Sequence, residues 1–365
     1  MSVARPSSSA KLALLTSGGD CAGLNAVIRA VVIHATHNYG WEVIGIQEGT
    51  HGLLFDPPHI QKLDPGKLDF ELFRKGGTIL GTTNKGDPFS LDTPTGKKDC
   101  SKEMIARLKA LGCGMLIGVG GDGSMSILKR LADLGGIRLV GIPKTIDNDV
   151  GATEISIGFS TAVDIATEAL DRLQPTAASH NRVMVLEVMG RDAGHIALHA
   201  GVAGGADVIL IPEIPYDIKK VAAHINGIRK RGRNFALIIV SEAVPTKEGR
   251  KIGKVFAGGQ KRLGGIGDYI GEQIAEMCQA EVRVTVLGHV QRGGPPNATD
   301  RTLATAMGVH AVDLLAKGAG DRMVCWINRQ VESVKLGDAI ATYRAIEQSD
   351  SMITAARALG VCFGN

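Results

Sequence analysis

The segment Gly114-Met-Leu-Ile-Gly-Val-Gly-Gly-Asp-Gly-Ser124 decides the fold. Its first six residues are apolar or glycine and predict a buried strand, and a glycine-rich turn then leads into the helix-like residues 124–134. The stretch Leu14-Leu-Thr-Ser-Gly-Gly-Asp20, before the helix-like residues 24–37, has the same form. Two such turns on neighbouring parallel strands can line one ligand from two sides.

The rest of the chain alternates in the same way between short aliphatic runs and longer amphipathic stretches. The expected strands are 11–16, 42–47, 114–119, 138–142, 182–188, 208–211, 234–240, 282–287 and 323–327. The expected helices are 24–37, 101–111, 124–134, 161–178, 193–203, 217–230, 261–279 and 299–317. Unbroken apolar strands between helices predict an α/β fold with two Rossmann-like three-layer lobes, mostly parallel sheets and an active site in the inter-lobe cleft.

Composition narrows the class of protein. Glycine makes up 48 of 365 residues, while aromatic residues are only 4%, so we expect an aliphatic core and many tight turns or close backbone approaches. The net charge is +4 with scattered basic residues, and no apolar run reaches the ~18 residues of a membrane span, so we expect no nucleic-acid or membrane partner. Six cysteines without a C-x-x-C pair favour a reduced, cytoplasmic protein.

The run from Gly118 to Ser124 has the composition of a phosphate-binding loop. Glycines let backbone N–H groups approach a phosphate, and the following helix N-terminus adds a positive dipole. The run also matches the dinucleotide pattern G-x-G-x-x-G, but Asp122 inside it would repel a bare pyrophosphate. An aspartate at that place is better explained as a Mg²⁺ ligand, and a tight turn without a ligand is the alternative.

The polar stretch Pro143-Lys-Thr-Ile-Asp-Asn-Asp149 follows another predicted strand. Like charges crowded at strand ends do not stabilise a fold, so Asp147 and Asp149 favour a metal or proton-transfer role over a solvated turn. In phosphoryl transfer to an alcohol, one carboxylate accepts the hydroxyl proton while others hold Mg²⁺. Lys144 would neutralise phosphate charge.

Cationic side chains flank two further strands. Met189-Gly-Arg191 follows the expected strand 182–188, and His289-Val-Gln-Arg292 follows 282–287. Arg182 and Arg283 stand near the starts of the same two strands. Several such groups beside glycines favour binding of an anionic substrate, since arginine binds phosphate bidentately.

Taken together, the chain resembles the phosphofructokinase family. The matching stretches, in family order over about 15–330, are Leu15-Thr-Ser-Gly-Gly-Asp20 with Gly23-Leu-Asn25, Gly76-Gly-Thr-Ile-Leu-Gly81, Gly120-Gly-Asp-Gly-Ser124, Pro143-Lys-Thr-Ile-Asp-Asn-Asp149, Met189-Gly-Arg191 and Leu287-Gly-His-Val-Gln-Arg-Gly-Gly294. Any one of them is a weak signal, whereas six in order are specific. The resemblance implies transfer of a phosphoryl group from Mg²⁺-bound ATP to the 1-hydroxyl of fructose 6-phosphate in glycolysis.

The resemblance also implies roles for individual residues. The implied catalytic residues are Asp147 as the base, with Arg191, Thr145 and Lys144, and the implied Mg²⁺ ligands are Asp122 and Asp149. The implied nucleotide contacts are Gly18, Gly121, Asp122, Gly123 and Ser124. Asn84 and Lys85 stand where many bacterial ATP-dependent members place an arginine that bridges the phosphates, and we expect them to contact the nucleotide in its place. The implied sugar-phosphate contacts are Thr145, Ile146, Asp147, Arg182, Met189, Gly190, Arg191, Glu242, Arg283, His289 and Arg292, of which Arg182 and Arg283 would reach across from a neighbouring subunit.

The same resemblance implies which part of the chain binds each substrate. Residues 1–158 plus about 291–341 would bind nucleotide, and about 159–290 plus 342–365 would bind the sugar phosphate. The expected assembly is a homodimer or homotetramer.

Two positions disagree about the phosphoryl donor. Pyrophosphate-dependent family members carry Asp where Gly123 stands, so Gly123 leaves room for ATP. They also carry Lys where Lys144 stands, while many ATP-dependent members carry Gly there. We give Gly123 more weight because the residue at this position controls whether ATP can enter the site. ATP is therefore the expected donor, and pyrophosphate is the alternative.

The family's effector pocket is only partly present. Arg29, Arg231 and Arg233 match its cationic positions, but Ile33 and Gln174 stand where arginines are expected, which predicts weak or altered regulation. A catalytically dead sugar-phosphate binder and an NAD-linked dehydrogenase are alternatives from other classes. The retained Asp122, Asp147 and Arg191 speak against the first, and a missing acidic residue ~20 residues after the glycine loop speaks against the second.

Overall fold

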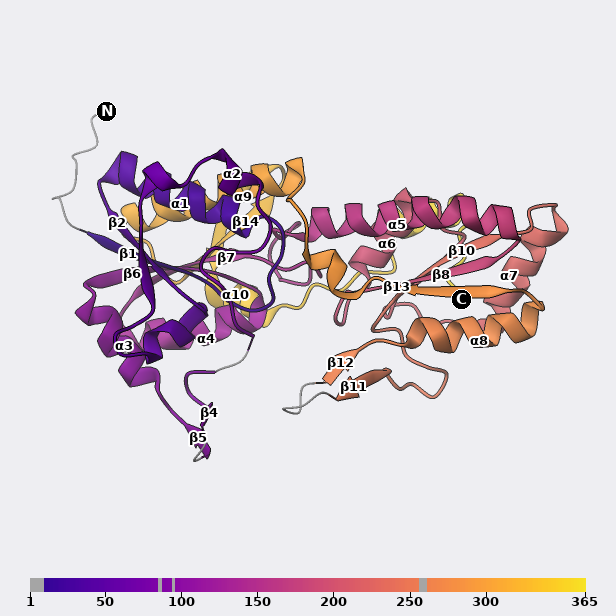
Figure 1. The fold of residues 1–365 in the computed structure, drawn as a ribbon, viewed down its shortest axis with the longest axis horizontal. Coiled ribbons are helices and arrows are strands. Elements are labelled where there is room, and N and C mark those ends of the chain that lie inside the picture. The colour runs from indigo at the N-terminus through magenta and orange to yellow at the C-terminus, as the bar shows by residue number, and fades with distance from the viewer. Residues whose placement is uncertain (1–9, 85–86, 94–95, 256–260) are drawn as a thin grey trace. The chain divides into compact units, whose positions relative to one another are not determined.

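The computed structural model describes residues 10–84, 87–93, 96–255 and 261–365, and the chain divides into two compact units (Figure 1). Unit 1 comprises residues 1–145, 150–158 and 292–343, and unit 2 comprises residues 146–149, 159–291 and 344–365. The expected lobes had boundaries at 158/159, about 290/291 and about 341/342. What each unit binds stays a prediction.

Unit 1 is built on a seven-stranded sheet with the order β15-β14-β7-β6-β1-β2-β3. Its strands are β1 (Lys11–Thr16), β2 (Glu42–Ile46), β3 (Ile60–Leu63), β6 (Cys113–Gly120), β7 (Arg138–Pro143), β14 (Arg322–Ile327) and β15 (Gln330–Lys335). The five central strands are parallel, and only the edge strands β3 and β15 run antiparallel to their neighbours. A separate hairpin, β4 (Leu91–Thr93) with β5 (Gly96–Lys98), also belongs to this unit.

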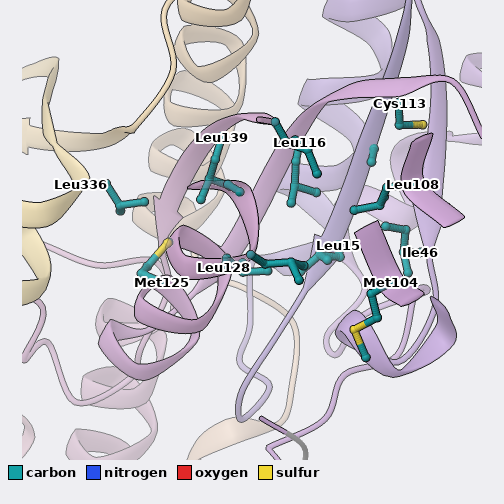
Figure 2. Packing of buried hydrophobic residues seen from close by; sticks show 14 of the residues in the cluster. Leu15, Ile46, Met104, Leu108, Cys113, Leu116, Met125, Leu128, Leu139 and Leu336 are labelled. Carbon is teal, nitrogen blue, oxygen red and sulfur yellow. The ribbon is translucent and has the colours of Figure 1, made fainter. Parts of the chain in front are cut away.

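Helices cover both faces of this sheet, so its central strands are buried on both sides (Figure 1). The helices of unit 1 are α1 (Leu24–Tyr39), α2 (Phe70–Arg74), α3 (Ser101–Ala110), α4 (Asp122–Gly135), α9 (Ala298–Ala316) and α10 (Leu336–Ala341). One face packs against α1 and α9, and the other against α3, α4 and α10. The core on the second face is aliphatic and sulfur-containing, as expected from the low aromatic content; Leu116, Leu128 and Met104 lie within it (Figure 2).

Unit 2 has a four-stranded, fully parallel sheet with the order β13-β8-β10-β9. Its strands are β8 (Val183–Val188), β9 (Val208–Leu210), β10 (Ala236–Ser241) and β13 (Val282–Val286). Its helices are α5 (Phe159–His180), α6 (His195–Ala203), α7 (Ile218–Lys230), α8 (Ile266–Cys278) and α11 (Ser351–Ala358). The helices α5 and α6 cover one face, and α7 and α8 cover the other. Each unit is thus a three-layer α/β arrangement with a mostly parallel sheet, as predicted.

One expected helix is wrong in its first part. Residues 261–279 were expected to be helical, but Lys261–Leu263 form β12, which pairs with β11 (Gly253–Val255). Gly264 and Gly265 then adopt left-handed φ values of 141° and 100°, which glycine tolerates and a right-handed helix does not. The helix therefore begins only at Ile266.

Candidate active site

The strand order of unit 1 brings the two Gly-Gly-Asp turns together. β1 pairs with β6 on one side and with β2 on the other, so the strand order changes direction between β1 and β6. The Ser17 amide donates to the Val119 carbonyl at 2.9 Å and joins the two turns directly. In open α/β sheets the crevice beyond the strand ends at such a point is where ligands bind.

Gly18 lies at the centre of the first turn and has a φ of 84°, a conformation that favours glycine. A Cβ atom there would lie 3.2 Å from Ser124 Oγ and 3.3 Å from Lys144 Nζ. Ser124 is on α4 and Lys144 follows β7, so three predicted site residues of unit 1 converge. Their convergence places a hydroxyl and an ammonium group around a glycine backbone.

Two cations hold the carbonyl groups of this turn. The buried Lys144 donates from Nζ to the Gly19 carbonyl, and Arg292 donates from Nη1 to the Asp20 carbonyl at 3.0 Å. Since C=O and N–H point in opposite directions across a peptide plane, the next two amides are turned away from the cations. Arg292, which the family resemblance assigns to the sugar phosphate, thus belongs to unit 1 and contacts its first glycine turn.

The second turn leads into α4. Gly121 is its N-cap without a side-chain cap, and Asp122 occupies the first helical turn, so backbone amides remain available at the positive end of the helix. A Cβ built at Gly123 meets no heavy atom within 4 Å, whereas at Gly120 it would lie 2.6 Å from Ser124 Cβ. Gly123 therefore leaves open space beside the loop. Asn84 lies in unit 1, and Lys85 lies outside the described residues.

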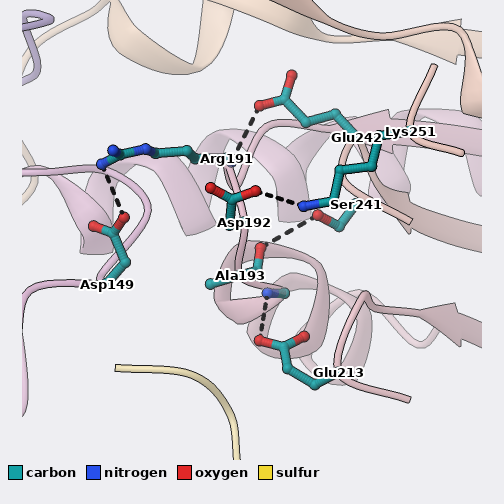
Figure 3. Close-up of polar contacts among 9 residues, drawn as sticks. Asp149, Arg191, Asp192, Ala193, Glu213, Ser241, Glu242 and Lys251 are labelled. Atoms are coloured by element: carbon teal, nitrogen blue, oxygen red, sulfur yellow. Dashed lines mark hydrogen bonds and ion pairs between the residues drawn. The ribbon is translucent and has the colours of Figure 1, made fainter. Parts of the chain in front are cut away.

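In unit 2, an arginine is held between carboxylates. Arg191 donates from Nη1 to Asp149 Oδ2 at 3.4 Å, and its backbone amide donates to Glu242 Oε1 at 3.1 Å (Figure 3). Asp149 is 2% exposed, and Ile146 and Asp147 are buried beside it in the chain. Arg191 and Asn148 have positive φ values of 54° and 55°, an uncommon conformation that collects at functional sites. Thr145, also buried, belongs to unit 1.

Glu242 has a perturbed ionisation. Burial raises the pKa of its carboxyl to about 7, the Arg191 amide opposes this, and the charge of Asp147 adds to it. A carboxyl that titrates near neutrality beside a buried aspartate is typical of an active site. The glycine between Met189 and Arg191 is required by packing, because a Cβ at Gly190 would overlap the Ala193 carbonyl.

The loops after β8 and β13 are joined by a residue that we did not predict. The buried Gln291 accepts a hydrogen bond from the Met189 amide at 2.8 Å. Gln291 stands inside a motif that we quoted, but an amide side chain carried no chemical signal of its own. His289, two residues earlier, is exposed in the 3-10 helix Gly288–Arg292.

Arg182 and Arg283 lie together at the opposite end of their strands. Both contact the carboxylate of Glu281, with Arg182 Nη2 at 2.9 Å from its Oε1. The six-residue strand β8, roughly 20 Å long at about 3.3 Å per residue, separates this cluster from Met189 and Arg191. A single chain therefore does not bring all predicted sugar-phosphate residues to one place.

The expected effector cations take part in contacts within each unit. Arg29 donates to the Leu68 carbonyl at 3.1 Å and lies 4.5 Å from the ring centre of Phe70. Arg233 pairs with Asp207 in unit 2. These contacts leave the prediction of weak regulation untested.

Among the described residues, no group of three or more His, Cys, Asp or Glu side chains could hold a metal ion by themselves. No helix in the described part of the chain is long and apolar enough to cross a membrane.

Two α/β units, a pair of glycine turns at a change of strand order, and an arginine set between carboxylates define a protein of the phosphoryl-transfer class. The family model described as Phosphofructokinase matches residues 11–315, and the chain belongs to the phosphofructokinase family.

Its relatives match over nearly their whole length. The chain is 59% identical to "ATP-dependent 6-phosphofructokinase 1" of a Synechocystis species, and the match covers 97% of this chain and 98% of the relative. It is 56% identical to the protein of the same name from a Nostoc species, and this match covers 98% of this chain and 99% of the relative. The phosphofructokinase structure from Saccharomyces cerevisiae matches with a TM-score of 0.77 and 29% identity, over 96% of this chain and 46% of that chain. The chain thus spans about half the length of the yeast chain.

Proposed function

We propose that this protein transfers the γ-phosphoryl group of ATP to the 1-hydroxyl of fructose 6-phosphate, giving fructose 1,6-bisphosphate and ADP, a step of glycolysis. The observation that carries the proposal is the 59% identity over nearly the whole chain to an ATP-dependent 6-phosphofructokinase. The open space beside Gly123 supports ATP, because a larger donor than pyrophosphate needs that room.

On the nucleotide side, the residues of unit 1 position the donor. The glycine turn at Gly18 and the N-terminus of α4 at Gly121, Gly123 and Ser124 offer backbone amides and a helix dipole to phosphate oxygens. Lys144 adds a positive charge next to Gly18. Asn84 and Lys85 complete the proposed nucleotide contacts. Such groups accelerate phosphoryl transfer by orienting the phosphates and stabilising their charge.

On the sugar side, Asp147 is the proposed base. Its carboxylate takes the proton of the 1-hydroxyl while that oxygen bonds to the γ-phosphorus and the bond from the γ-phosphorus to its bridging oxygen breaks. Arg191 balances the charge that develops. The remaining proposed sugar-phosphate contacts are Thr145, Ile146, Met189, Gly190, Glu242, His289 and Arg292, with Arg182 and Arg283 from a neighbouring subunit.

Mg²⁺ is part of the proposal, with Asp122 and Asp149 as the carboxylates that would hold it. Magnesium in such enzymes is bound by one or two carboxylates together with substrate phosphates and waters, so a cage of three protein ligands is not required. The donor chemistry fits, because Asp122 is partly exposed in the first turn of α4 beside the glycine loop. When bound, the ion neutralises phosphate charge.

Pyrophosphate-dependent transfer to the same sugar is the second candidate, and Lys144 is the observation that favours it. Its ammonium group is held against the Gly19 carbonyl, beside the turn that would bind phosphate. A lysine there can assist either donor, whereas the space at Gly123 suits ATP.

We further propose that the active enzyme is a homodimer or homotetramer in the cytoplasm. The separation of the Arg182 and Arg283 cluster from Arg191 by the length of β8 supports a site completed by a neighbouring copy.

The decisive experiment compares donors on one preparation of the purified chain. Fructose 6-phosphate and Mg²⁺ are supplied with either ATP or pyrophosphate, and formation of fructose 1,6-bisphosphate is measured. We expect turnover with ATP and little with pyrophosphate. The reverse preference would establish the second candidate, and binding of the sugar phosphate without turnover would identify a catalytically dead subunit.

A further inference from the structure

Glu281 holds two arginines on a single carboxylate oxygen. Arg182 Nη2 lies 2.9 Å from Glu281 Oε1, and Arg283 Nη2 contacts the same oxygen. The Val183 amide donates to the Glu281 carbonyl at 3.0 Å, so the starts of β8 and β13 are tied together at this point. The carboxylate and both guanidinium groups therefore form one cluster at the start of two neighbouring parallel strands.

Without the carboxylate this cluster would not hold together. Two guanidinium groups repel each other, and the rotatable bonds of each arginine side chain let its guanidinium group adopt many positions. The hydrogen bond from Arg182 lowers the pKa of the Glu281 carboxyl, and the charges of Arg182, Arg283 and His180 act in the same direction. Glu281 thus stays ionised and offsets one of the two arginine charges.

The cluster keeps donors free for an anion. The side chain of Arg283 is 57% exposed and that of Arg182 is 23% exposed. Arg182 directs Nη2 at Glu281, and Arg283 directs Nη2 at Glu281 and donates from Nη1 to the Val282 carbonyl at 3.3 Å. A guanidinium group has five N–H donors, so further donors remain on both side chains. A phosphomonoester dianion, with three terminal oxygens, suits two adjacent guanidinium groups with a remaining net positive charge.

We propose that Glu281 is a positioning residue that holds Arg182 and Arg283 side by side for the phosphate of the sugar substrate. The inference rests on the proposed function, in which these two arginines bind that phosphate. It adds a residue with no direct substrate contact, whose carboxylate orders the pair before the ligand arrives and so reduces the entropy lost on binding.

The test replaces the carboxylate with the uncharged amide of the same shape, Glu281→Gln, in the full chain. The matched control is Glu276→Gln, an exposed glutamate on α8. We expect Glu281→Gln to raise the KM for fructose 6-phosphate about tenfold, with kcat and the KM for ATP within about twofold of the wild type. The control leaves all three constants unchanged, and circular dichroism checks that both variants are folded.

A double-variant cycle shows whether Glu281 acts through the arginines. In an Arg283→Ala background, adding Glu281→Gln should change the KM for fructose 6-phosphate by much less than it does alone. An unchanged or lowered KM in Glu281→Gln, or the same tenfold rise in both backgrounds, would overturn the inference.

Calorimetric binding of fructose 6-phosphate without nucleotide separates this inference from the proposed function. Suppose that the wild-type chain binds the sugar phosphate but shows no turnover, and that Glu281→Gln binds it more weakly. This result would contradict the proposed function and support the role of Glu281. Turnover in the wild type with equal affinity in both chains would do the opposite.

Discussion

At the scale of single residues, Glu242 makes the folded chain sensitive to pH. Its pKa is raised to about 7 from an ordinary value of 4.5, chiefly by burial, so the folded chain binds this proton more tightly than the unfolded chain does. The free energy of unfolding should therefore fall as pH rises from about 4.5 to about 7 and level off above it, by on the order of 3 kcal/mol from this group.

Urea unfolding at pH 5 and pH 8 measures this effect. Glu242→Gln resembles the protonated carboxyl, so it should match the wild type more closely at pH 5 and be the more stable of the two at pH 8. The same difference between variant and wild type at both pH values would show that Glu242 does not titrate in this range.

Turnover should also depend strongly on Lys144. Its ammonium group contacts the Gly19 carbonyl beside the first glycine turn, where it can stabilise phosphate charge as that charge shifts during transfer. Lys144→Ala should lower kcat about 100-fold and change the KM for fructose 6-phosphate by less than about threefold. Lys109→Ala, an exposed lysine on α3, is the control. Unchanged turnover in Lys144→Ala would refute its role in catalysis.

At the scale of elements, Gly118 lies where α4 packs against β6. A Cβ at this position would overlap Leu128 Cδ1, and Leu128 is buried in the core beneath the helix (Figure 2). Gly118→Ala should cost about 1–3 kcal/mol of unfolding free energy through overpacking. It should also raise the KM for ATP, because α4 carries Gly121 to Ser124 at its N-terminus.

Combining the change with Leu128→Val checks this explanation. The smaller side chain should restore part of both losses, so the two substitutions would be non-additive in denaturation and in kinetics. Additive losses would mean that the helix position does not depend on this contact. Gly114→Ala on the same strand, where a Cβ meets nothing within 4 Å, should leave the KM for ATP unchanged.

The strand–turn–helix elements were predictable because their signals are local. An unbroken apolar run such as Lys11–Thr16 and a glycine turn before a helix can be read from neighbouring residues alone. The antiparallel edge strands β3 and β15 were missed, since their partly exposed patterns lack an apolar run. Candidate site residues could be named from the sequence where they carry charge inside a motif, and their roles stay predictions. Glu281 and Gln291 were not predicted, because their contacts are with residues distant in the sequence. The pairing of β8 with β13 brings Arg182 to Glu281, and the loop after β13 brings Gln291 to the Met189 amide.

At the scale of the whole molecule, the division of the sugar-phosphate residues between two ends of one sheet bears on assembly. Arg182 and Arg283 lie at the start of β8 and β13, while Arg191 follows the end of β8. In a homo-oligomer, symmetry allows each copy to supply its arginine pair to a neighbour's site. Each active site would then combine Arg191 of one copy with the arginine pair of a neighbouring copy.

Mixed oligomers test this directly. Asp147→Ala removes the proposed base and Arg283→Ala removes a proposed phosphate contact, so each variant alone should be nearly inactive at a fructose 6-phosphate concentration well below the KM of Arg283→Ala. In a mixed dimer, the copy that keeps Asp147 would receive an intact Arg283 from its neighbour and regain one complete site. Equal co-expression should restore about a quarter of wild-type activity, since roughly half of the dimers are mixed and each has one working site of two. A mixture no more active than its two components would place Arg283 in the active site of its own chain.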